Sequence, residues 1–273
     1  ITNTGTIIAT GVSADAIYVN SIWEGNFDNS GLIQGPDSAF EFVGDTYDGD
    51  FINSDRMFGG KNGVILGDSY TNIYNGDGNA QFRNTGTIGG SDYGVRVLGN
   101  NVDMDFINDS SDPLYFPPGE ISASSESGIG VMLAASNWSG NVTNSGTITG
   151  GYIGMVIGAT NTEGLNAVTG SFNGTITNTG SIGGGQTGLY ITAENFTGSV
   201  DNSGNITGDD GVGVNFVGAS SDAVFGNKFS PGTFTNTGSI VGNSTGLRIA
   251  FDSITADILN DVGGYISGGS TGA

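Results

Sequence analysis

The amino-acid sequence predicts an all-β protein, and more specifically a single parallel β-helix, or β-solenoid, of about ten coils over residues 1–273. Three observations support this prediction. An asparagine motif recurs along the chain, an apolar residue usually follows it four positions later, and an apolar–variable–apolar triplet comes next. The 51 glycines are consistent with frequent tight turns between short strands.

The first element of the repeat is an asparagine with a large apolar residue two positions before it and usually Ser-Gly or Thr-Gly after it. Its ten copies are centred on Asn3, Asn29, Asn53, Asn84, Asn108, Asn144, Asn178, Asn202, Asn236 and Asn260. Asparagine tolerates positive φ, and its amide both donates and accepts hydrogen bonds. We therefore expect each copy at a turn, bonded to its equivalents in the coils above and below.

The second and third elements have the patterns of short strands. The residues assigned to the second element are Ile7, Ile33, Met57, Ile88, Ile121, Ile148, Ile182, Ile206, Ile240 and Ile266. The triplets lie at 17–19, 40–42, 64–66, 95–97, 131–133, 155–157, 189–191, 214–216 and 247–249. Both outer positions of every triplet are apolar and the middle one varies, which indicates a strand with one buried face.

Three short strands per 24-residue coil cannot bury themselves singly but can when coils stack. Coils stacked at ~4.8 Å give a rod on the order of 45 Å long. We expect right-handed coiling, because crossovers between parallel strands are strongly right-handed. Longer units predict four loop insertions, at 67–75, 109–119, 160–170 and 219–231.

The composition argues against several functions. The formal net charge is −21, with six Lys and Arg residues against 27 Asp and Glu, so the surface repels nucleic acids and anionic membranes. The chain has no Cys and no His, which disfavours catalysis by thiols or imidazoles and the usual zinc sites. We expect no enzyme activity, no nucleic-acid partner, no membrane insertion and no cofactor other than Ca²⁺.

Three clusters of aspartate are weak candidates for a Ca²⁺ site, because this cation prefers carboxylate and carbonyl oxygens. They are Asp45, Asp48 and Asp50; Asp103 and Asp105; and Asp209 and Asp210. None matches the twelve-residue EF-hand loop.

Two groups of residues are candidates for a contact surface. Met132, Val156 and Tyr190 occupy the middle triplet position on three successive coils, and an exposed strip there predicts a lateral interface. Tyr115 and Phe116 lie in a proline-rich insertion that either contacts a partner or folds back over the rod. The alternative for the strip is that neighbouring insertions cover it.

The pattern Ile-Thr-Asn-Thr-Gly-Thr-Ile at 1–7 and the Gly-Leu-x-Ile pattern at 188–191 and 246–249 carry a resemblance to a known group of proteins. They resemble the β-solenoid passenger regions of bacterial autotransporters and giant surface adhesins. The resemblance covers essentially the whole chain and implies secretion and display at the bacterial cell surface. Both ends fall inside the repeat, so we expect a segment of a longer surface protein.

The function expected is therefore structural or adhesive, in a stalk, adhesin, surface layer or fibre, with a second copy, a host or cell-surface protein or a glycan as partner. One alternative is a self-assembling extracellular filament or lattice protomer. Another is a protein that binds or degrades polysaccharide, because parallel β-helices also carry paired carboxylates for that chemistry. Glu41 is the one carboxylate in the middle column of the triplets.

Overall fold

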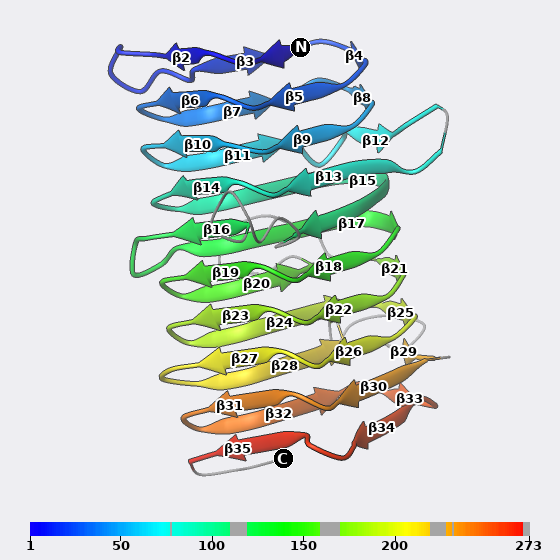
Figure 1. Ribbon diagram of the computed structural model, residues 1–273. Coiled ribbons are helices and arrows are strands. Elements are labelled where there is room, and N and C mark those ends of the chain that lie inside the picture. The colour runs from blue at the N-terminus through cyan, green and yellow to red at the C-terminus, as the bar shows by residue number, and fades with distance from the viewer. Residues whose placement is uncertain (77, 110–118, 159–169, 219–227, 231, 270–273) are drawn as a thin grey trace.

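Residues 1–76, 78–109, 119–158, 170–218, 228–230 and 232–269 are described by the computed structural model of this chain. They form strands and turns without any helix, and consequently no helix in this part of the chain is long and apolar enough to cross a membrane. Figure 1 shows the strands stacked coil upon coil into a rod, from the coil of β2 at one end to that of β35 at the other. The predicted β-solenoid is confirmed.

One side of the rod, the isoleucine face, is a parallel sheet with one strand from each of ten coils. Its strands are β2 (Thr6–Ile8), β6 (Leu32–Gly35), β10 (Arg56–Gly59), β14 (Thr87–Gly90), β16 (Glu120–Ala123), β19 (Thr147–Gly150), β23 (Ser181–Gly184), β27 (Asn205–Gly208), β31 (Ser239–Gly242) and β35 (Tyr265–Gly268). The register aligns the predicted second-element residues in one column, including Ile121 and Ile266. Their side chains point into the core.

A second side, the asparagine face, carries the recurrent motif. Its strands are β1 (Thr2–Asn3), β5 (Phe27–Asn29), β9 (Phe51–Asn53), β13 (Ala80–Asn84), the end of β15 (Tyr93–Asn108), β18 (Val142–Asn144), β22 (Ile176–Asn178), β26 (Val200–Asn202), β30 (Thr233–Asn236) and β34 (Asp257–Asn260). Each asparagine donates from Nδ2 to Oδ1 of the next, over 2.7 to 2.9 Å, from Asn3 to Asn260. We call this column the inner ladder.

The inner ladder confirms the predicted hydrogen bonds but not the predicted backbone. These asparagines end strands, and among the described residues Ser13 is the one non-glycine with positive φ. Their side chains point inward and nine of the ten are buried, Asn260 at the last coil being exposed. The amide of Asn29 also donates to the carbonyl of Gly31 over 2.8 Å, so it joins successive coils and closes the turn after its own strand.

A third side, the triplet face, contains the apolar–variable–apolar segments. Its strands are β3 (Ile17–Val19), β7 (Ser38–Phe42), β11 (Asn62–Leu66), the start of β15, the start of β17 (Ile129–Ser139), β20 (Ile153–Ile157), β24 (Thr187–Ala193), β28 (Val212–Gly218) and β32 (Thr245–Ala250). In the coils from β7 to β28 both outer positions of the triplet are buried, as the alternation predicts.

The three predicted strand segments of each coil are present, and most coils add a fourth short strand between the triplet face and the next asparagine face. This fourth face consists of β4 (Trp23–Glu24), β8 (Thr46–Asp48), β12 (Asn72–Tyr74), residues 101–103 of β15, residues 137–139 of β17, β21 (Ser171–Asn173), β25 (Asn195–Thr197), β29 (Lys228–Phe229) and β33 (Ser253–Ile254). Each segment sends one residue inward, so it has no apolar alternation for a sequence pattern to detect.

The inward column of the fourth face completes the core with large side chains. It comprises Trp23, Tyr47, Ile73, Val102, Trp138, Phe172, Phe196 and Phe229, whereas the equivalent Ile254 in the last coil is exposed. The rings of Phe172 and Phe196 stack with their centroids 5.0 Å apart. This packing gives the rod a rigid side beneath an outward surface made of polar residues.

The fourth strand also corrects the first predicted insertion. Residues 67–75 contain the regular strand β12, and the extra residues of that coil lie partly before it, between β11 and β12, and mostly after it, between β12 and β13. The other three predicted insertions fall largely outside the described residues.

Candidate functional site

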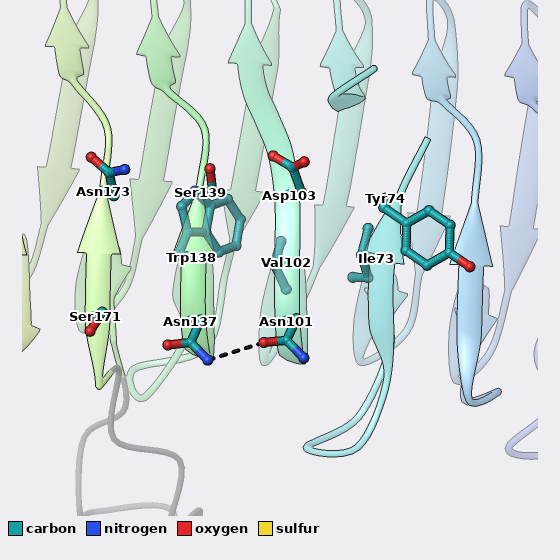
Figure 2. Close-up of a pocket in the computed structure, with 10 residues that line it drawn as sticks. All are labelled: Ile73, Tyr74, Asn101, Val102, Asp103, Asn137, Trp138, Ser139, Ser171 and Asn173. Atoms are coloured by element: carbon teal, nitrogen blue, oxygen red, sulfur yellow. Dashed lines mark hydrogen bonds between the residues drawn. The ribbon is translucent and has the colours of Figure 1, made fainter. Parts of the chain in front are cut away.

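A groove of about 440 Å³ lies over the fourth face, across the coils of β12, β15, β17 and β21. Its volume is within the range of about 300–1,000 Å³ that is common for ligand pockets. Figure 2 shows residues from neighbouring strands that line it. They are Ile73, Tyr74, Asn101, Val102, Asp103, Asn137, Trp138, Ser139, Ser171 and Asn173.

Two columns of polar side chains run along the groove because the strands pair in register. The first polar column contains Asn72, Asn101, Asn137 and Ser171, and the second contains Asp103, Ser139 and Asn173. Residues between the columns point to the core, since side chains alternate along a strand. The coils therefore present amide and hydroxyl groups at regular intervals along the rod.

The first polar column forms a hydrogen-bonded ladder of its own, which we call the outer ladder. Asn137 Nδ2 donates to Asn101 Oδ1 over 3.0 Å, as the dashed line in Figure 2 shows, and Asn101 Nδ2 donates to Asn72 Oδ1 over 3.0 Å. Asn101 and Asn137 are exposed. These bonds orient the amides before any ligand arrives, which lowers the entropy cost of binding.

Two further features distinguish the groove chemically. Tyr74, from β12, has 41% of its surface exposed and so offers an aromatic ring at one end of the groove. Oδ1 of Asp103 is buried and receives no hydrogen bond from the described residues. A hydrogen-bond donor from a ligand stabilises a buried carboxylate oxygen of this kind.

The floor of the groove is firm because its inward side chains belong to the core. Ile73, Val102 and Trp138 are exposed by 1%, 2% and 2%. The Trp138 ring stacks on Phe172 with a centroid separation of 6.4 Å. A site on such a support keeps its geometry better than one on a surface loop.

In the first group of candidate metal ligands, two of the three aspartates accept hydrogen bonds from backbone N–H groups of the chain after β12. Asp45 is exposed, Asp48 accepts a hydrogen bond from the backbone N–H of Gly76 over 2.8 Å, and Asp50 Oδ1 accepts from the backbone N–H of Gln81 over 3.0 Å. The carboxylates of Asp48 and Asp50 thus hold the extra residues that follow β12.

The other candidate ligands are also dispersed. Asp103 lines the groove, whereas Asp105 accepts from the backbone N–H of Asn141 over 2.7 Å. Asp209 and Asp210 are exposed in the turn before β28. Within the described ranges, no three acidic side chains come close enough together to hold a metal ion.

The prediction of an exposed apolar strip on the triplet face is wrong. Met132 and Val156 are fully buried, and Tyr190 is half-buried. They pack with outward residues of the flanking strands into a small second cluster, which comprises Tyr93, Leu98, Ile129, Met132, Ala134, Ile153 and Val156 with Tyr190 against it. The other interface candidates, Tyr115 and Phe116, lie outside the described residues.

Glu41 and Arg96 belong to the same outward column as that cluster, with Ile65 between them. Burial raises the pKa of the Glu41 carboxyl, and the nearby charge of Asp15 raises it further. Burial lowers the pKa of the Arg96 guanidinium, which lies 5.4 Å from the centre of the Tyr93 ring. Neither Glu41 nor Arg96 lines the groove.

The sequence interpretation included Asp103 but missed the rest of the groove. A signal was present: in most coils the inward residue of the fourth strand precedes the apolar residue of the asparagine motif by four positions, as in Trp23 and Phe27, Trp138 and Val142, and Phe196 and Val200. Recognising that spacing identifies the residues beside it, such as Asn137 and Ser139, as outward.

No protein-family model, curated protein or solved structure matches this chain. The fold and the groove are therefore the basis for the functional argument.

Proposed function

We propose that this chain is a rigid, non-enzymatic segment of a secreted bacterial cell-surface protein, in which it acts as a stalk or adhesive element. The observation that carries the proposal is the inner ladder, which links ten successive coils by hydrogen bonds that are buried up to the last coil. Every coil is bonded to its neighbours through both backbone and side chains. This construction suits a protein whose task is to hold a fixed length and display a surface.

Two properties of the sequence support the same proposal. The repeat patterns resemble those of autotransporter passenger regions and giant surface adhesins, which are secreted and displayed on bacteria. The net charge of −21 keeps a long rod soluble and prevents non-specific association with nucleic acids.

The alternatives have less support. Lateral assembly through Met132 and Val156 is disfavoured because both are buried, although a filament or lattice could use other surfaces. Glycoside hydrolysis usually requires two carboxyl groups about 5–10 Å apart. Among the described residues that line the groove, Asp103 is the one carboxylate.

Three measurements test the proposal. Immunogold electron microscopy of source cells, with antibodies raised against the purified chain, should label the outer surface. Small-angle X-ray scattering should give a rod, and incubation with polysaccharides should release no reducing ends. Any one of three results would contradict the proposal. These are label confined to the cell interior, a scattering profile of a compact globule, and glycan-cleaving activity that copurifies with the chain.

A further inference from the structure

We propose that the groove of the fourth face binds an uncharged glycan chain that lies along the axis of the rod. This inference rests on the proposed adhesive role and assigns it a site and a class of ligand. The groove combines oriented amides and hydroxyls, an exposed aromatic ring and one carboxylate on a firm floor.

The polar columns match the chemistry of sugar hydroxyls. Asn and Ser side chains both donate and accept hydrogen bonds, as each hydroxyl of a sugar does. The coils repeat at ~4.8 Å, which is close to the length of one sugar ring in an extended chain. Successive sugars therefore meet equivalent groups on successive coils, such as Asn101, Asn137 and Ser171.

Tyr74 and Asp103 supply the remaining contacts. The exposed ring of Tyr74 provides a flat apolar surface for the C–H face of a sugar at one end of the groove. Oδ1 of Asp103 lacks a donor among the described residues, and a sugar hydroxyl supplies one after a small rotation of the carboxylate.

The backbone around the groove argues against an extended peptide as the ligand. A peptide that binds by adding a strand needs unpaired N–H and C=O groups. The strands of the groove are paired with coils on both sides, β15 with β12 and β17, and β21 with β17 and β25. Recognition here must therefore come from side chains.

The charges select an uncharged glycan. The described residues that line the groove include Asp103 and no Lys or Arg, and the chain as a whole has a net charge of −21. An acidic polysaccharide is repelled by such a surface.

Isothermal titration of the full chain with hexasaccharides tests the inference. The probes are cellohexaose, mannohexaose and fully N-acetylated chitohexaose, with hexagalacturonate as the acidic counterpart. We expect at least one uncharged probe to bind and hexagalacturonate not to bind. Failure of all three uncharged probes, or binding of hexagalacturonate alone, overturns the inference.

Variants locate the site. Tyr74→Ala removes the ring, and Ser139→Tyr fills the groove; each should weaken binding about tenfold or more, a loss of about 1.4 kcal/mol or more. Tyr152→Ala is the matched control, because Tyr152 is 40% exposed in the turn between β19 and β20 whereas Tyr74 is 41% exposed. This control should bind as the parent does.

Thermal unfolding will show whether Ser139→Tyr folds. If it does not, the binding measurements on Tyr74→Ala still test whether the groove is the site. Equal affinity of Tyr74→Ala and Tyr152→Ala for the bound probe overturns the assignment to this groove. A rod that scatters as expected and labels the cell surface, but binds none of the uncharged probes, refutes the inference while leaving the proposed function intact.

Discussion

The inner and outer ladders use the same side-chain hydrogen bond on opposite sides of the coil wall. Inside, Asn144 donates to Asn178 over 2.8 Å, and Asn144 is 1% exposed. Outside, Asn137 donates to Asn101 over 3.0 Å, and both are exposed to solvent. The geometry is nearly equal, so the difference between the ladders lies in their access to water.

That difference assigns the two ladders different tasks. A buried amide that loses its partner costs the full penalty of desolvation, about 1–3 kcal/mol, whereas an exposed one finds water instead. The inner ladder therefore stabilises the stack of coils. The outer ladder can exchange its water for the hydroxyls of a ligand at little cost to the fold.

The largest loss of stability should come from a cavity in the core beneath the fourth face. Phe196→Ala should lower the free energy of unfolding by about 3–5 kcal/mol, because it leaves a cavity beside Phe172 and Phe229. The control, Asn195→Ala, changes the exposed neighbour in β25 and should stay within about 0.5 kcal/mol. Urea unfolding measures both, and equal effects would refute the distinction between the two sides.

The second-largest loss of stability should distinguish the inner ladder from the outer ladder directly. Asn144→Ala removes the middle of the inner ladder and leaves Asn108 and Asn178 each without one bond, so it should cost about 2–4 kcal/mol. Asn101→Ala makes the same change in the outer ladder and should cost less than about 0.5 kcal/mol. A large loss of stability in Asn101→Ala would show that the outer ladder also holds the fold together.

The smallest change in stability should come from replacing Glu41, which is half-buried on the triplet face. Its pKa is raised in the folded state, chiefly by burial, so the ionised carboxylate opposes folding above that pKa and the protonated form does not. Glu41→Gln should therefore stabilise the protein at neutral pH, and the gain should disappear as the pH falls below the ordinary pKa of 4.5. Thermal unfolding across this pH range measures it, and a gain that grows on acidification would contradict the burial argument.

Much of the fold was predictable because its signals are local and repeated. The inward residues of the asparagine and triplet faces recur with a fixed spacing, and each copy repeats the same strand pattern. The fourth strand was missed because a single inward residue, such as Phe172 or Phe196, sits between polar neighbours and shows no alternation. Positive φ was predicted for Asn29 and its equivalents from turn propensity, but inward hydrogen bonding places them at strand ends instead.

The sequence by itself determined the solenoid, the number of coils and the partners within the inner ladder, since a repeat that buries apolar residues must stack in register. Only the tertiary structure decided what the outside of the rod looks like. Asn72, Asn101 and Asn137 are separated by 29 and 36 residues in the chain, and coils of unequal length bring them into one column. The tertiary structure also decided that the outward Met132 and Val156 are buried in an apolar cluster, because the burial of an outward side chain depends on neighbours that its own strand does not contain.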